Sequence, residues 1–280
     1  MKDYEHHVLG DDYYYARNGK NKDDKLAFWH WLKGAELGSV QCMKNVSWAY
    51  RDGIGTDVDL KKHEEWNGKG KHAYVTSYFS DPAILQDKWV ESIFHAKRNG
   101  YFVEVGASTG VGSSNCCMLE RKLGWEGICI EPNPEFFKEL VKNRATCVNA
   151  PIAPDEREVQ FRAAGYYGGI QDNLTHWHKK EWENAPLITM KTRRLEDILD
   201  EHGAPPVIDY LSLDIEGGEA GIIESFPFDR YRVLTMTVEQ SERRVVKAIE
   251  NAGFKIVNNP FSDPSVNWEL HCIHESIFEG

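Results

Sequence analysis

The chain has 280 residues, 41% of them hydrophobic, and its 44 acidic and 33 basic side chains give a formal net charge of −11. An acidic chain without a basic stripe repels phosphate backbones, so this composition argues against a nucleic-acid substrate. No apolar run approaches the ~18 residues of a membrane helix, which argues against a membrane span.

The six cysteines show no CxxC pair and no zinc-finger spacing. We interpret them as small buried hydrophobic residues in a reducing compartment. The opening Met1-Lys2-Asp3 lacks the features of a signal peptide. We therefore expect a cytoplasmic protein.

A degenerate repeat occupies the N-terminal part of the sequence. Residues 15–19 recur as 49–53, and the spacing of about 34 to 36 residues is typical of helix–turn–helix repeats. Two amphipathic helices are expected between the copies, at 26–34 and 40–50. The stretch 27–60 resembles a Sel1-like, tetratricopeptide-related repeat.

This resemblance predicts a small all-helical repeat segment over residues 1–72, with 67–71 as the linker to a second domain over 73–280. Two incomplete repeats cannot form a long solenoid, so the segment is expected to dock on something. A protein partner or a second copy of the chain would meet this requirement. The alternative is an irregular helical extension packed on the main domain.

From residue 73, short apolar runs rich in β-branched residues alternate with helical patterns. Strands are expected at 101–105, 127–130, 147–152, 210–213 and 233–238. Helices are expected at 113–123, 134–143, 195–202, 219–226 and 242–252. This alternation predicts an α/β fold with a doubly wound, Rossmann-like sheet, whose ligands bind at the carboxyl ends of the strands.

The first predicted strand contains Glu104 and leads into a loop with Gly106 and Gly110. Its G-x-x-x-G spacing differs from the G-x-G-x-x-G of dinucleotide sites, which argues against an NAD-dependent oxidoreductase. A carboxylate before the loop would repel a pyrophosphate but suits the ammonium or sulfonium of S-adenosylmethionine (SAM).

The next two predicted strands also end in candidate cofactor contacts. Glu131-Pro132 follows the second strand, where a carboxylate can accept hydrogen bonds from both ribose hydroxyls. Ala150 ends the third strand and offers a small apolar surface to adenine.

These motifs resemble the FkbM-type family of SAM-dependent methyltransferases, from about residue 77 to 261. The matching stretches include YFVEVGASTGVGSSNCCMLERKLGWEGICIEPNPEFF and IDYLSLDIEGGEAGIIESF, in the family's order. The resemblance implies transfer of a methyl group from SAM, mainly to hydroxyls of sugars, polysaccharides and secondary metabolites. It further implies a SAM pocket that includes Gln86, Gly106, Ser108, Gly110, Asn115 and Glu131. The sequence departs from the family at Gln240, where members often carry histidine.

Carboxylates gather after the fourth and fifth predicted strands, at Asp214, Glu216 and Glu239. Buried acids cost several kcal/mol unless they are paired or bind a ligand, so we predict that these three are catalytic. Two routes to an activated hydroxyl remain open. A carboxylate or histidine acts as general base, or Asp214, Glu239 and Gln240 hold Mg²⁺ or Mn²⁺.

The segment 166–178 mixes glycines, aromatic residues and histidines, and is expected to form a substrate lid with Tyr167, His176 and His178 as contacts. The predicted function is therefore O-methylation of a sugar, a glycan or a secondary metabolite. An inactive adaptor that uses the helical repeats is the alternative.

Overall fold

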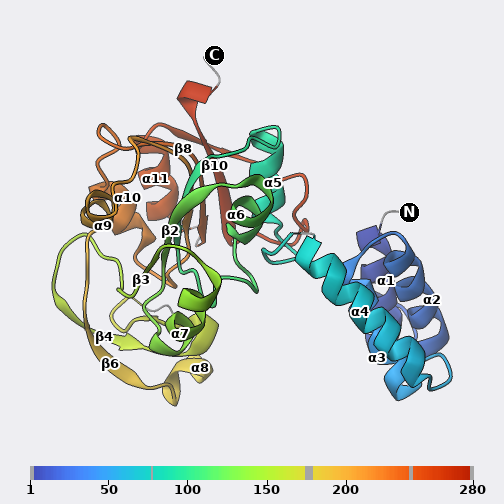
Figure 1. The fold of residues 1–280 in the computed structure, drawn as a ribbon. Coiled ribbons are helices and arrows are strands. Elements are labelled where there is room, and N and C mark those ends of the chain that lie inside the picture. The colour runs from blue at the N-terminus through green and yellow to red at the C-terminus, as the bar shows by residue number, and fades with distance from the viewer. Residues whose placement is uncertain (1–2, 77, 174–178, 240–241, 278–280) are drawn as a thin grey trace. The chain divides into compact units, whose positions relative to one another are not determined.

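The computed structural model describes residues 3–76, 78–173, 179–239 and 242–277 (Figure 1). The chain divides into two compact units, Met1–Tyr78 and Phe79–Gly280. Each unit has its own buried core. The units are therefore described separately.

The described residues of the first unit form the helices α1 (Asp3–Tyr15), α2 (Asp24–Glu36), α3 (Val40–Asp52) and α4 (Leu60–Thr76). Local signals set their ends, because the side chain of Asp23 caps the first turn of α2 and Gly53, at φ 72°, ends α3. The core of this unit forms around the buried Ala27, Trp31 and Val46. The prediction of an N-terminal all-helical segment is confirmed.

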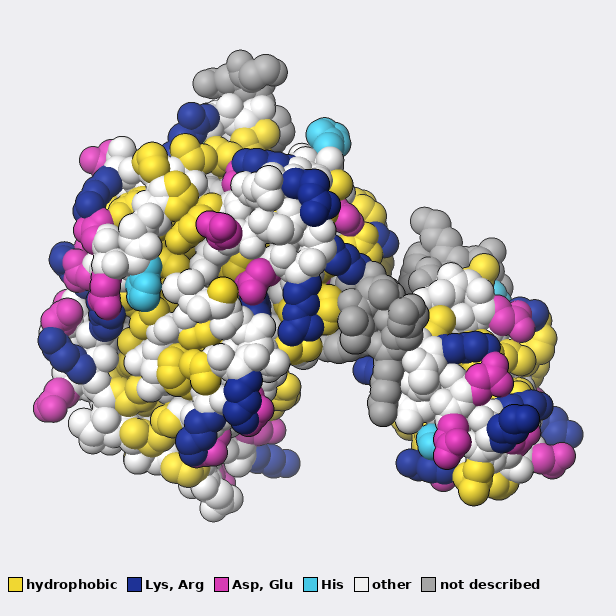
Figure 2. Space-filling view, viewed as in Figure 1, with side chains coloured by type: hydrophobic (Ala, Val, Ile, Leu, Met, Phe, Trp, Pro, Cys, Tyr) yellow, Lys and Arg dark blue, Asp and Glu magenta, His cyan; other side chains and the backbone are white. Residues whose placement is uncertain are grey.

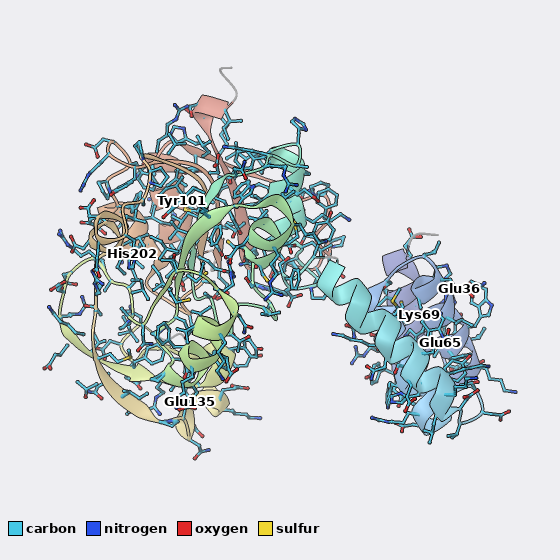
Figure 3. The ribbon with its side chains drawn as sticks, viewed as in Figure 1. Glu36, Glu65, Lys69, Tyr101, Glu135 and His202 are labelled. Carbon is cyan, nitrogen blue, oxygen red and sulfur yellow. The ribbon has the colours of Figure 1, made fainter. Side chains whose placement is uncertain are left out.

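The interpretation of residues 67–71 as a linker is wrong, because these residues lie inside α4. Glu65 and Lys69 form an ion pair of 2.7 Å across one turn of this helix (Figure 3). A Cβ added at Gly70 would lie 3.4 Å from the Cβ of Met43 in α3. Gly70 therefore lies in ordinary packing distance of α3 and does not mark flexible chain.

In the second unit, the described strands form a seven-stranded sheet of order β3-β2-β1-β7-β8-β10-β9. Their bounds are β1 Tyr101–Val105, β2 Glu126–Ile130, β3 Cys147–Val148, β7 Val207–Leu213, β8 Arg232–Glu239, β9 Phe254–Val257 and β10 Glu269–His274. The first five in this order run parallel, and β10 is antiparallel to both of its neighbours. The doubly wound, Rossmann-like fold is confirmed, with its switch point between β1 and β7.

Helices cover the sheet (Figure 1). They are α5 Gln86–Ile93, α6 Cys117–Leu123, α7 Pro134–Asn143, α9 Leu195–Glu201, α10 Glu219–Ser225 and α11 Arg243–Asn251. Side chains of α9, α10 and α11, such as Ile198, Ile222 and Ile249, share a core with Val103 and Val105 of β1. Side chains alternate along a strand, so Phe102 and Glu104 lie on the opposite face of the sheet.

A second, antiparallel sheet of order β5-β4-β6 was not predicted. It consists of β4 (Glu158–Arg162), β5 (Gly169–Ile170) and β6 (Leu187–Lys191), with the short helices η1 (Gly165–Tyr167) and α8 (Lys179–Glu183) nearby in the chain. Part of the predicted lid is therefore regular structure, while 174–178 lie outside the described residues. The predicted strand 147–152 is also shorter, because β3 ends at Val148.

All six cysteines are free, and five of them are buried, as predicted. No helix among the described residues is both long and apolar enough to cross a membrane.

Candidate active site

A cavity lies at the carboxyl ends of β1, β2 and β7, at the switch point of the sheet. Seven of the residues predicted from the sequence line it: Gly106, Ser108, Glu131, Pro132, Ala150, Asp214 and Glu216. The topology thus brings together side chains that are more than 100 positions apart in the chain. No lysine or arginine is among the described residues of this lining.

The loop after β1 crosses the end of β7 at very close range. Gly106 has φ 86°, and a Cβ added there would lie 1.9 Å from the backbone oxygen of Asp214. Only glycine fits this position without a shift of the backbone. The loop then places the backbone N–H of Ser108 2.8 Å from the carboxylate of Glu131.

Glu131 is held in place by backbone donors. Its two carboxylate oxygens accept hydrogen bonds from the N–H of Ser108 at 2.8 Å and of Asn133 at 2.7 Å. Burial raises the pKa of Glu131 to about 7. The two backbone donors lower this pKa, but by less than burial raises it. Each oxygen keeps a lone pair that can accept a hydroxyl of a ligand.

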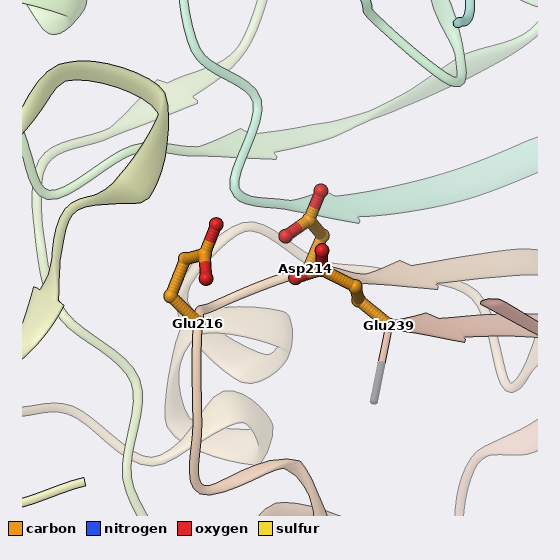
Figure 4. A group of neighbouring side chains, drawn as sticks. All are labelled: Asp214, Glu216 and Glu239. Carbon is orange, nitrogen blue, oxygen red and sulfur yellow. The ribbon is translucent and has the colours of Figure 1, made fainter. Parts of the chain in front are cut away.

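Three carboxylates, those of Asp214, Glu216 and Glu239, converge at this edge of the sheet, as Figure 4 shows. One oxygen from each of Asp214, Glu216 and Glu239 lies within 4.8 Å of the others. Glu216 is 7% exposed and has φ 60°, in the left-handed region, and Gly217 and Gly218 follow with φ 125° and 104°. Holding a non-glycine residue in this backbone conformation costs about 1–3 kcal/mol of stability. The backbone at Glu216 is therefore strained in the conformation that places its carboxylate in the cluster.

The cluster carries more negative charge than its surroundings balance. The ion pairs among the described residues leave Asp214, Glu216 and Glu239 without a basic partner. Burial raises the pKa of Asp214 and of Glu216, and the charge of Asp214, followed by burial, raises that of Glu239. Carboxylates in this arrangement are stabilised by a shared proton or by a bound cation.

Glu104 lies outside the cavity lining. Its carboxylate pairs at 2.9 Å with Arg144, and these side chains are 2% and 0% exposed. It also accepts hydrogen bonds from the hydroxyl of Ser114 at 2.8 Å and the N–H of Asn115 at 2.6 Å. Glu104 therefore holds the loop after β1 in place through these contacts. The sequence had predicted a direct contact between Glu104 and the cofactor.

Three other predicted cofactor residues also lie outside this lining. Asn115 donates to the hydroxyl of Ser212 at 2.9 Å, and a Cβ added at Gly110 would lie 2.6 Å from the Cγ of Arg144. Both residues thus support the loop. Gln86 is 4% exposed and contacts Glu269 on β10.

The predicted substrate contacts have different outcomes. Tyr167 is 40% exposed and absent from the cavity lining, whereas its neighbour Tyr166 lines the cavity. His176, His178 and Gln240 lie outside the described residues.

Sequence reasoning missed an aromatic and apolar wall of the cavity. Phe136, Phe161, Tyr166 and Ile170 line it, and the rings of Phe136 and Tyr166 lie 5.1 Å apart. Phe161 and Ile170 come from the unpredicted second sheet. The available sequence signal was the alternation along β4, where the apolar Val159 and Phe161 stand between the polar Glu158, Gln160 and Arg162.

The family model of the methyltransferase FkbM domain matches residues 104–256. No curated protein matches the chain.

Among solved structures, the chain is similar to an FkbM methyltransferase from Methylobacillus flagellatus, with 12% identity, coverage of 89% of this chain and 61% of that one, and a TM-score of 0.40. A TehB-like SAM-dependent methyltransferase from Corynebacterium glutamicum shows 10% identity, coverage of 77% and 99%, and a TM-score of 0.37. A Sel1 repeat protein from Oxalobacter formigenes shows 14% identity, coverage of 50% and 44%, and a TM-score of 0.26.

Proposed function

The chain belongs to the FkbM methyltransferase family, and from this premise we propose that it transfers the methyl group of SAM to a hydroxyl of a sugar, a glycan or a secondary metabolite. The observation that carries this proposal is the cluster of three carboxylates without a basic partner among the described residues, of which Asp214 and Glu216 line the cavity at the switch point while Glu239 lies outside its lining. Such a lining suits a cationic methyl donor and an alcohol that must give up a proton.

The residues of the cavity fit SAM. Glu131 has lone pairs for the two ribose hydroxyls, and the buried hydroxyl of Ser108 has no hydrogen-bond partner among the described residues. Gly106 lets the backbone approach a ligand closely, and Pro132 and Ala150 offer apolar contact to adenine. When bound, SAM supplies an electrophilic methyl group on a sulfonium.

The side chains of the cluster prepare the acceptor. An alcohol is a weak nucleophile until its proton is removed or shared, and a positioned base contributes about 10²–10⁴-fold to the rate. The carboxyl of Glu239 is hydrogen-bonded to that of Asp214, which leaves Asp214 as the charged partner of the pair. We assign Asp214 as the general base and Glu216 as an acceptor contact.

A divalent cation is the second route to an activated hydroxyl. Asp214 and Glu239 would supply oxygen ligands, with Glu216 or Gln240 as the third. The shared proton already reduces the charge of the cluster, so we expect turnover to persist after treatment with EDTA. Activity that is lost to EDTA and restored by Mg²⁺ or Mn²⁺ would assign the cluster to a metal.

Glu131 should make the affinity for the cofactor depend on pH. The ionised carboxylate accepts both ribose hydroxyls, so the affinity for S-adenosylhomocysteine (SAH) should rise as the pH increases through about 7, the pKa of Glu131 in the free protein. Glu131→Ala should weaken binding by about 10- to 150-fold, the equivalent of ~1.5–3 kcal/mol. Calorimetric titration between pH 5.5 and 8.5 measures both effects.

Glu131→Gln should flatten this pH profile. The control is Glu135→Gln, because Glu135 is exposed on the same segment of chain (Figure 3). A pH profile that is the same in wild type and Glu131→Gln would show that Glu131 does not bind the ribose.

The charge of the surface argues against a nucleic-acid acceptor. Lysine and arginine side chains are interspersed with aspartate and glutamate on the face drawn in Figure 2, and the net charge is −11.

For the N-terminal segment predicted from the sequence, residues 1–72, we propose a Sel1-like repeat that binds a protein partner or a second copy of the chain. Exposed apolar side chains such as Leu26 and Trp29 support this role.

The proposal is tested with SAM that carries an isotopically labelled methyl group and a panel of sugars and polyols. We expect release of SAH together with a product labelled on oxygen, both detected by mass spectrometry. Transfer to nitrogen or carbon, with no labelled oxygen in the products, would contradict O-methylation.

A further inference from the structure

One aromatic ring lies at the open end of the cavity that contains the predicted catalytic carboxylates. Tyr166 lines this cavity together with Asp214 and Glu216, yet the tyrosine is 58% exposed. A tyrosine contributes a large, rigid apolar area when it is covered. A ring that lines a cavity and is still more than half open therefore offers this area to a ligand.

The opposite, closed end of the same cavity is apolar. Its lining includes four buried side chains, Ala150, Ile152, Phe161 and Ile170. The adenine of SAM is flat and apolar on both faces, so it is stabilised most where the lining is buried. The cofactor thus takes the closed end, and the ring of Tyr166 at the open end is left for the second ligand, the acceptor.

The backbone beneath this ring is fixed. Tyr166 is the middle residue of the short helix η1, which begins at Gly165 with φ 64°. The indole N–H of the buried Trp182 donates to the backbone oxygen of Tyr167, the last residue of η1, at 2.8 Å. A ring placed before the ligand arrives costs less to order on binding.

A second ring and a carboxylate complete the surroundings of an acceptor. The ring of Phe136, on α7, lies 5.1 Å from that of Tyr166, at 52° between the two planes. Glu216, assigned above as an acceptor contact, lines the same cavity. A ligand in this space meets both an aromatic face and a hydrogen-bond acceptor. A hydroxylated ring matches the two, because it has an apolar face and O–H donors at its edge.

We propose that Tyr166 determines the choice of acceptor, because its ring stacks on the flat face of a ring-shaped molecule whose hydroxyls reach Glu216 and Asp214. The shared chemistry is a hydroxylated ring, which is either the saturated ring of a sugar or cyclitol or the aromatic ring of a phenol. An open-chain polyol has no such face. This inference rests on the proposed function, because it names the acceptor of the same site.

Binding to the SAH-loaded wild-type protein tests the inference without turnover. The probes are myo-inositol, which is a saturated ring, mannitol, which is an open chain with the same number of hydroxyls, and catechol, which is an aromatic ring. We expect one of the two rings to bind about tenfold more tightly than mannitol. A preference for inositol would identify a sugar-like acceptor, and a preference for catechol a phenolic one. Mannitol bound as tightly as both rings, or no binding of any probe, would overturn the inference.

Variants assign the preference to Tyr166. Tyr166→Ala should weaken binding of the preferred ring by about tenfold while SAH affinity stays within about twofold of wild type, and Tyr166→Phe, which keeps the ring, should retain the preference. The control Tyr167→Ala makes the same change at the next position, which is exposed and outside the cavity lining, and should bind all ligands like wild type. A ring preference that survives in Tyr166→Ala would overturn the inference. So would a tenfold loss of SAH affinity in this variant, because the ring would then cover the adenine.

The outcomes separate this inference from the proposed function. A ring preference that depends on Tyr166, without methyl transfer to oxygen, would support the stacking role and contradict O-methylation. Methylation on oxygen at equal rates in wild type and Tyr166→Ala, with no ring preference in binding, would support O-methylation and overturn the role of Tyr166.

Discussion

Asp214→Asn is expected to lower turnover by about 10²–10⁴-fold while SAH affinity stays within about twofold of wild type. The amide keeps the size of the side chain but cannot take a proton from the acceptor. It also removes the charge that holds the proton on Glu239. Single-turnover methyl transfer and calorimetry with SAH measure the two quantities separately.

Asp229→Asn is the matched control, because it makes the same chemical change at an exposed position outside the cavity lining. It should leave turnover and SAH affinity unchanged. Near-normal turnover in Asp214→Asn would contradict both the general-base route and the metal route, since each requires this carboxylate.

Arg144→Met is expected to cost about 3–5 kcal/mol of the free energy of unfolding, because it leaves the carboxylate of Glu104 buried without its charged partner. A domain is stable by only ~5–15 kcal/mol, so the loss is a large part of the total. Arg144 also pairs with Glu120 at 2.7 Å, which ties α6 into the same network. Urea unfolding followed by tryptophan fluorescence measures the change.

The double variant Glu104→Gln/Arg144→Met removes the unpaired charge and should recover part of the stability. The control Arg244→Met breaks only the exposed ion pair with Glu224, which should cost at most about 1 kcal/mol. A similarly small loss in Arg144→Met would show that the buried pair does not hold the loop.

Elements of the fold could be predicted where the local sequence pattern and the tertiary packing favour the same helix or strand. The bounds of β1 and α7 match the expected 101–105 and 134–143, because a five-residue apolar run and a proline-led amphipathic helix are unambiguous. The site followed from topology, since parallel strands place Glu131, Asp214 and Glu216 at one edge of the sheet. The rule that ligands bind at the carboxyl ends of parallel strands therefore predicts the position of the cavity from the sequence alone.

Other features depend on contacts that leave no local signal. Arg144 meets Glu104 across 40 positions of sequence, so nothing near Glu104 indicates that its charge is already paired. The insertion of β10 between β8 and β9 reverses chain order, and it places Glu269 opposite Glu239. The helix at 67–71 was missed because composition alone does not show that Gly70 packs against α3.

Calorimetric titration of the wild-type chain with SAH, with NAD as the comparison ligand, tests the central claim that this edge of the sheet holds the methyl donor. The account predicts saturable binding of one SAH per chain and no heat from NAD. A chain that binds neither ligand, although it is folded, would contradict the enzyme assignment and favour an adaptor built on the helical repeats.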